Sequence, residues 1–162
     1  MKIAVGSDHH GFAYKEVIKQ YLQDNHHEVI DYGCYSCDEV DYPGVAFEVG
    51  KDIVNGKAER GILICGTGIG VAIAAGKVPG IRAALCHDTY SAERSQKSNN
   101  AQILTLGAKV IGIEAALKVV ETWVNSKYEG GNSGRKIQQI MDQEQEFLKA
   151  GLADETTNPT KC

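Results

Sequence analysis

The segment from Gly61 to Lys77 contains the residues of this chain whose types and spacing could carry chemistry. It reads Gly-Ile-Leu-Ile-Cys-Gly-Thr-Gly-Ile-Gly-Val-Ala-Ile-Ala-Ala-Gly-Lys. The apolar run before Cys65 is typical of a strand buried on both faces. The glycines that follow let backbone N–H groups turn toward a ligand with no Cβ in the way. We therefore predict a strand, an anion-holding loop and a helix, with a reactive Cys65 thiolate at the lip of the loop.

The residue spacing in this loop excludes a cysteine phosphatase and argues against a dinucleotide-binding site. A cysteine phosphatase needs an arginine six positions after its nucleophile, and that position is Val71. A dinucleotide site needs its third glycine three residues after the second, whereas here the glycines lie two apart. Asp88, after the next strand, keeps a nucleotide role open. What remains is a base beside an amide cradle, the arrangement that removes a proton α to a carbonyl and holds the enediolate.

Short apolar runs alternate with amphipathic stretches, and these elements must position the loop. Strands are predicted at residues 2–6, 28–32, 62–64, 81–86 and 103–106, and helices at 12–25, 43–55, 71–75, 90–97, 112–126 and 137–148. This alternation predicts an α/β fold: a three-layer, doubly wound, Rossmann-like five-stranded parallel sheet with a C-terminal helix. The carboxyl ends of parallel strands meet at one edge, so Asp8, His9 and His87 are expected near Cys65.

Composition indicates a globular protein of one domain. The chain has 162 residues, 43% of them hydrophobic, and a net charge of −4, which argues against nucleic-acid binding. No stretch resembles a membrane span or a signal peptide, so a cytoplasmic location is expected. Residues 1–150 are assigned to the domain and 151–162 to a polar, flexible tail.

The five cysteines are expected to be reduced. The Cys34–Cys37 pair has no second ligand pair, so no metal site is predicted.

Motifs in five places along the chain together resemble one known family. They are Ser7-Asp8-His9-x-Gly11, Asp41-Tyr42-Pro43, Ile64-Cys65-Gly66-Thr67-Gly68-Ile69-Gly70, Lys77-Val78-Pro79-Gly80-Ile81-Arg82-Ala83 and Tyr128-Glu129-Gly130-Gly131. In order and spacing they resemble the type B ribose-5-phosphate isomerases, within the wider RpiB/LacAB sugar-phosphate isomerase family. The resemblance covers about residues 1–145.

The resemblance implies a role for each matching residue. Cys65 matches the family's catalytic base, which moves a proton between C2 and C1 of the opened sugar, and Thr67 matches the hydroxyl that assists it. Asp8 and His9 match residues that contact sugar hydroxyls and phosphate, and Asn99 matches the asparagine that binds the sugar near its reacting end. The amides that would stabilise the enediolate belong to Gly66, Gly68, Ile69 and Gly70. The resemblance also implies no metal or cofactor, and a homodimer or homotetramer with shared active sites.

Several positions depart from the family's pattern. Many relatives have a histidine, thought to open the furanose ring, immediately before the asparagine, and this chain has Ser98 there. Two arginines after the Gly-Gly pair are replaced by Asn132 and Lys136, with Arg135 beside the second, and a third basic position is Lys109. Lysine binds phosphate as a point charge, without the bidentate geometry of arginine. Phosphate contact is predicted from at least one of Lys109, Arg135 and Lys136.

Together these features predict an aldose–ketose isomerase of the pentose phosphate pathway, which interconverts ribose 5-phosphate and ribulose 5-phosphate through a cis-enediolate. Two alternatives stay open. One is an isomerase of the same family that acts on allose, allose 6-phosphate, galactose 6-phosphate or a similar hexose; the other is a non-catalytic sugar-phosphate-binding subunit. Single residues also have structural interpretations, since Thr67 and Asp8 could cap helices and His10 is expected to be a surface residue.

Overall fold

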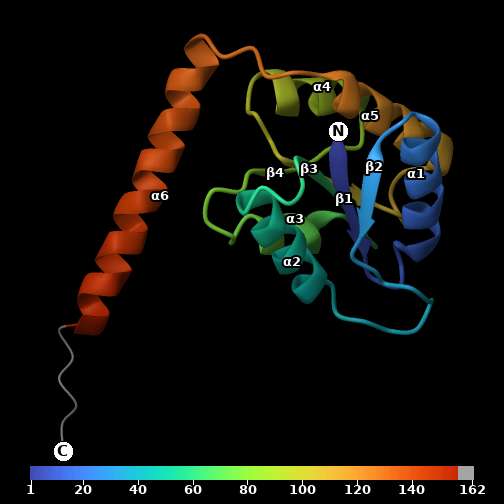
Figure 1. Ribbon diagram of the computed structural model, residues 1–162, viewed down its shortest axis with the longest axis horizontal. Coiled ribbons are helices and arrows are strands. Elements are labelled where there is room, and N and C mark those ends of the chain that lie inside the picture. Colours follow the sequence, from blue (N-terminus) through green and yellow to red (C-terminus); the bar gives the residue numbers. More distant parts are fainter. Residues whose placement is uncertain (157–162) are drawn as a thin grey trace, which may run out of the picture.

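Five parallel strands form the centre of the protein. The computed structural model describes the backbone of residues 1–156 and the side chains of residues 1–151. The strands are β1 (Lys2–Ser7), β2 (Glu28–Asp31), β3 (Arg60–Cys65), β4 (Ala83–Leu85) and β5 (Ile103–Gly107), in the order β2-β1-β3-β5-β4 (Figure 1). The strand order reverses between β1 and β3, and in doubly wound sheets ligands bind beside such a reversal.

Helices cover both faces of the sheet, which gives the three layers that the sequence predicts. One face carries α1 (Phe12–Asp24), α4 (Thr89–Lys97) and α5 (Ile113–Asn125), and the other carries α2 (Tyr42–Val54) and α3 (Ile69–Ala75). Each helix turns an apolar stripe inward; Ile18 and Leu22 of α1 and Trp123 of α5 are fully buried. The predicted fold class is therefore confirmed.

Two boundaries beside the site differ from those predicted. Helix α3 begins at Ile69, two residues earlier than expected, because Gly68 takes a left-handed φ of 77° and turns the chain directly into the helix. Strand β4 is shorter than the predicted 81–86, since it is an edge strand whose residues pair with β5 only from Ala83 to Leu85.

Helix α6 (Asn132–Thr156) stands clear of the sheet in Figure 1. It begins five residues before its predicted start and continues past residue 151, where a tail was expected; residues 157–162 lie outside the described part of the chain. Contacts with the domain include the Gly80 amide, which donates to Glu144 Oε2 (2.8 Å), and the buried side chain of Ile137. Over the described residues, no helix is long and apolar enough to cross a membrane.

Lys15 is fully buried, although the sequence places it on the polar face of α1. Its ammonium donates to Asp31 Oδ1 and to Glu16 Oε1, both at 2.7 Å, and Lys19 donates to Asp31 Oδ2 at 2.8 Å. Burial alone would raise the pKa of the Asp31 carboxyl, but the hydrogen bonds from the two lysines outweigh it, and the pKa lies below its ordinary value. The carboxylate therefore stabilises the fold above its ordinary pKa, and this contribution is lost as pH falls through the lowered value.

Substituting Asp31→Asn is expected to destabilise the protein by about 3 kcal/mol at neutral pH, because it leaves the buried Lys15 charge without its main counterion. Urea unfolding measures the change. The matched control is Asp24→Asn, at an exposed carboxylate whose partner is the side chain of Gln20 on the same helix. If both variants unfold at the wild-type urea concentration, the Lys15–Asp31 pair does not stabilise the fold.

Candidate active site

A cavity of about 530 Å³ opens at the carboxyl edge of the sheet, where β1, β3 and β5 end. Its wall contains residues from the turns after these three strands and from helices α2 and α3. They are Asp8, His10, Tyr42, Cys65, Gly66, Thr67, Ile69, Gly70, Ile73 and Lys109. The cavity thus lies beside the strand-order reversal, as the general rule for doubly wound sheets predicts.

Strand register brings the polar residues of this wall together. Ser7 pairs with Ile64 and Cys65 pairs with Gly107, so the next residues of all three strands emerge side by side. The amide of Asp8 donates to the Ile64 carbonyl (3.2 Å), and the amide of Lys109 donates to the Gly66 carbonyl (3.0 Å). Asp8, Cys65 and Lys109 are therefore fixed by backbone hydrogen bonds and not by side-chain packing alone.

The Cys65 sulfur lies in the floor of the cavity. Its residue is only 4% exposed, yet it borders the open space and is not sealed behind hydrocarbon. The Gly68 amide donates a hydrogen bond to Cys65 Sγ at 3.1 Å. An N–H donor directed at sulfur stabilises negative charge there, and a thiolate is the form of cysteine that acts as a base or nucleophile. The arrangement is thus suited to hold a reactive sulfur within reach of a ligand.

Two glycines of the loop are required by close packing. A Cβ on Gly68 would lie 2.6 Å from Leu85 Cδ1 and 2.7 Å from the Leu106 carbonyl carbon. A Cβ on Gly70 would lie 2.6 Å from the ring of Tyr42, which covers the loop from the α2 side. At Gly68 the contact includes backbone atoms, so an added side chain would displace the loop amides, whereas at Gly70 the Tyr42 side chain would have to move aside.

Thr67 and Asp8 both act as local caps and both border the cavity. Thr67 Oγ1 accepts a hydrogen bond from the Ile69 amide (3.2 Å) at the start of α3, and Asp8 Oδ1 accepts one from the Gly11 amide (3.0 Å) before α1. The capping roles that the sequence left open are therefore present. Both side chains also line the cavity. Capping uses only part of their hydrogen-bonding capacity, so each can still bond to a ligand there.

Of the two adjacent histidines, His10 lines the cavity and His9 does not, which is the reverse of the expectation. His9, predicted to contact substrate, does not line this cavity; its Nδ1 accepts a hydrogen bond from the Val40 amide (3.3 Å). His10, expected on the surface, lines the cavity, with its Nε2 3.2 Å from Lys109 Nζ. His87 is also outside the cavity wall, because its Nε2 accepts from the Gly107 amide (2.9 Å).

The other predicted substrate-binding residues lie elsewhere in this chain. Asn99 and Lys136 border a smaller hollow of about 280 Å³ between α4 and α6, and Arg135 is exposed on α6. Ser98 borders the same hollow, and its Oγ accepts hydrogen bonds from the Arg94 guanidinium. None of the four borders the Cys65 cavity. The predicted residues thus form two groups, and one copy of the chain does not bring them together.

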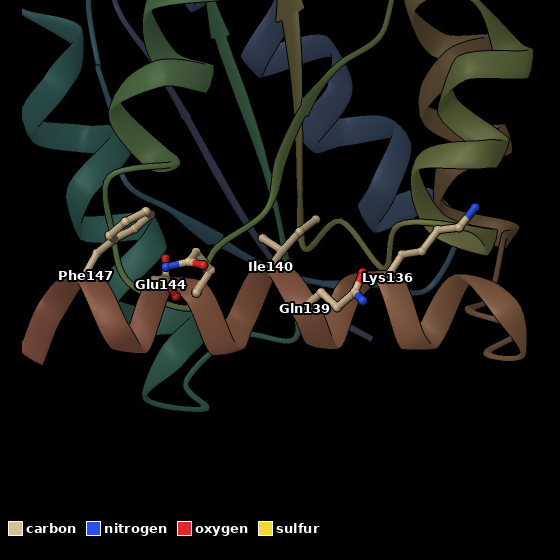
Figure 2. A pocket seen from close by; sticks show the side chains of 6 residues that line it. Lys136, Gln139, Ile140, Glu144 and Phe147 are labelled. Atoms are coloured by element: carbon tan, nitrogen blue, oxygen red, sulfur yellow. The ribbon is translucent and has the colours of Figure 1, made fainter.

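A third hollow, of about 640 Å³, runs along one face of α6. Figure 2 shows Lys136, Ile140 and Phe147 on this face, directed toward the rest of the molecule. Ile140 is 56% exposed and Phe147 is 69% exposed. The hollow is lined by one helix, and its exposed apolar side chains fit an interface better than a reaction site.

Sequence reasoning missed three residues of the Cys65 cavity as site residues: His10, Tyr42 and Ile73. Tyr42 belongs to the Asp41-Tyr42-Pro43 motif, which drew attention only as a mark of the family. Its place at the first turn of α2, opposite the glycine loop, is the signal that could have assigned it. His10 gave no such signal, because the direction of a side chain in a tight turn does not follow from periodicity. Among the described residues, no group of three or more His, Cys, Asp and Glu side chains is placed to hold a metal ion.

Fold and cavity together define the class: a doubly wound α/β protein with a cysteine-containing ligand site at the carboxyl edge of its sheet. The model of the Ribose/Galactose Isomerase family matches residues 3–140. The chain is 48% identical to a D-erythrulose-4-phosphate isomerase of Pectobacterium atrosepticum, over 86% of this chain and 93% of that protein. It is 47% identical to a Ribose-5-P isomerase B of Listeria innocua, over 85% and 93% of the two chains.

A solved structure of Clostridium thermocellum ribose-5-phosphate isomerase B has the same fold. It superposes with a TM-score of 0.89 at 43% identity and covers 91% of this chain and 99% of its own. The chain therefore belongs to the ribose/galactose isomerase family, and it is an isomerase.

Proposed function

We propose that this protein interconverts ribose 5-phosphate and ribulose 5-phosphate in the cytoplasm, with Cys65 as the base. The observation that carries the proposal is the Cys65 sulfur, which accepts the Gly68 amide hydrogen bond and borders a cavity large enough for a sugar phosphate. Membership of the isomerase family and the similarity to a Ribose-5-P isomerase B support the substrate.

In the proposed reaction the Cys65 thiolate removes the proton from C2 of the open-chain aldose. The electron pair moves into the carbonyl, and the negative charge of the resulting cis-enediolate is held by the amides of Gly66, Gly68, Ile69 and Gly70, of which Gly68 and Ile69 also donate to Cys65 Sγ and Thr67 Oγ1. The Thr67 hydroxyl assists proton movement between the two oxygens. Return of a proton from the Cys65 thiol to C1 then gives the ketose and regenerates the thiolate.

The separation of the predicted residues supports a shared active site. The group containing Asn99, Arg135 and Lys136 does not border the Cys65 cavity of its own chain, while α6 presents an exposed apolar face that includes Ile140 and Phe147. We infer a homodimer or homotetramer in which one copy's α4–α6 region completes the Cys65 cavity of another. Basic residues of α6 would then bind the phosphate from across the interface.

A tetrose 4-phosphate is a second candidate substrate, and Ser98 is the observation that favours it. A neutral hydroxyl is a poor acid for opening a furanose ring. A tetrose that carries phosphate on O4 has no hydroxyl left with which to close a five-membered ring, so it needs no ring-opening group. The similarity to a D-erythrulose-4-phosphate isomerase is consistent with this candidate.

A substrate panel distinguishes these candidates. We expect kcat/KM for ribose 5-phosphate to exceed that for allose 6-phosphate, galactose 6-phosphate and free allose by at least about tenfold, because each mismatch in a shaped polar pocket costs 1 kcal/mol or more. Free ribose is the control for the phosphate. A higher kcat/KM for erythrose 4-phosphate would give first place to the tetrose, and a higher value for a six-carbon sugar would overturn both. Binding of these phosphates without turnover would leave a non-catalytic subunit.

A further inference from the structure

Strand β5 runs past the end of its edge neighbour β4, and a histidine side chain completes the ladder there. The two strands pair only as far as Leu85 and Thr105. The Ile103 amide donates to β4, and by the two-residue period of a strand the Gly107 amide points to the same side. That amide donates to His87 Nε2 at 2.9 Å. The imidazole thus takes the place of a backbone carbonyl that β4 does not supply.

The backbone of Gly107 lies against the glycine loop. Gly107 pairs with Cys65 in the register of β3 and β5. A Cβ on Gly107 would come within 2.5 Å of the Thr67 carbonyl oxygen, and a Cβ on Gly68 would lie 3.0 Å from the Gly107 nitrogen. Any displacement of Gly107 is therefore passed to Gly68, whose amide bonds the Cys65 sulfur.

His87 is itself held from the following helix. Asp88 is the N-cap of α4, and its Oδ1 accepts a hydrogen bond from the Ser91 amide at 2.7 Å. The His87 ring is half-buried and does not border the Cys65 cavity. Its influence on the cavity must therefore pass through the Gly107 amide.

We propose that His87 is a positioning residue, which holds the end of β5 against the loop and so keeps the Gly68 amide directed at the Cys65 sulfur. Without an acceptor, the Gly107 N–H loses its partner and the end of β5 shifts toward water. A small displacement of the groups around a reacting atom has a large effect on rate. The kinetic consequence rests on the proposed isomerisation with Cys65 as the base.

Three substitutions at this position separate the acceptor from the ring. His87→Gln places Oε1 as many bonds from Cα as Nε2, His87→Asn places its oxygen one bond closer, and His87→Leu has no acceptor. We expect kcat for ribose 5-phosphate to fall about tenfold in the Asn and Leu variants and to stay within about twofold of wild type in the Gln variant. Affinity for D-ribitol 5-phosphate, which carries the phosphate but has no carbonyl, should change little in all three.

Amide hydrogen exchange followed by NMR tests the same contact without turnover. The amide protons of Gly107 and Gly68 are expected to exchange about tenfold faster in His87→Leu than in wild type, and His87→Gln should restore their protection. The amide of Leu104, deeper in β5 and fully buried, is the internal control for a general loss of stability.

Wild-type kcat together with wild-type exchange at Gly68 in His87→Leu would overturn the inference and leave the proposed isomerase intact. Equal impairment of the Gln and Leu variants would also overturn it, because the effect would then belong to the ring and not to its acceptor. A wild-type protein that does not turn over ribose 5-phosphate would overturn the proposed function, and exchange at Gly68 alone would then decide the role of His87.

Discussion

Replacing Cys65 with alanine is expected to lower kcat for the isomerisation of ribose 5-phosphate by about 10³-fold, since a positioned general base contributes ~10² to 10⁴ in rate. The sulfur borders the open space of the cavity and accepts an amide hydrogen bond that stabilises its anion. Affinity for D-ribitol 5-phosphate should stay within a few fold of wild type, because the substitution removes the base and leaves the loop amides in place.

The control for this substitution is Cys37→Ala. Cys37 is a free, exposed cysteine in the segment between β2 and α2, away from the cavity wall. Its replacement should leave kcat unchanged. Retention of full turnover by the Cys65→Ala protein would contradict the thiolate mechanism, whereas equal loss in both variants would point to general damage to the fold.

Gly68→Ala is expected to impair stability and catalysis together. The left-handed φ of 77° disfavours any Cβ, and the added methyl would meet Leu85 and Leu106 at 2.6–2.7 Å. Together the strain and the overpacking should cost about 3 kcal/mol of folding free energy. Displacement of the amide that bonds Cys65 Sγ should lower kcat by about 10²-fold, the usual effect of losing one anion-stabilising donor.

Urea unfolding and kcat measured on the same preparation test this prediction. Gly112→Ala is the matched control, because Gly112 has an ordinary φ of −68° at the start of α5 and a Cβ there would meet nothing within 4 Å. It should be neutral in both measurements. A Gly68→Ala protein that is as stable and active as wild type would mean that the loop does not depend on this backbone conformation.

The sheet and the place of the site were predictable from the sequence for one physical reason. A parallel strand buried on both faces must be an apolar run, and the run before Cys65 stops where the glycines begin, so both the strand and its functional end are encoded locally. Parallel strands bring their carboxyl ends to one edge, which predicts Asp8, His9 and His87 near Cys65; of these three, Asp8 borders the cavity.

Side-chain direction in turns and burial of charge were not predictable in this way. Periodicity does not decide whether His9 or His10 borders the cavity, because both residues lie in the turn between β1 and α1. Lys15 has helical spacing typical of a solvent-facing residue, and only the approach of Asp31 from β2 makes its burial possible. The length of α6 exceeds the prediction, since its first and last turns are polar and have no apolar periodicity.

The predicted site residues form two groups that one copy of the chain does not bring together. Family motifs assigned Asn99 and Lys136 to the same site as Cys65, yet they border a separate hollow between α4 and α6. Sequence motifs record which residues act together, and they do not record whether one copy or two supplies them. Only the structure separates the two groups, and that separation is why the proposed assembly shares its sites.

Isomerisation in deuterium oxide, followed by proton NMR, tests the central proposal most directly. The wild-type protein should convert ribose 5-phosphate to ribulose 5-phosphate with solvent deuterium incorporated at C1, and the Cys65→Ala protein should show neither conversion nor exchange. Rapid isomerisation with no deuterium in the product would mean that the C2 hydrogen is carried to C1 without exchange, either as a hydride or by a thiol that does not exchange with solvent. Exchange at the wild-type rate in Cys65→Ala would contradict the assignment of Cys65 as the base.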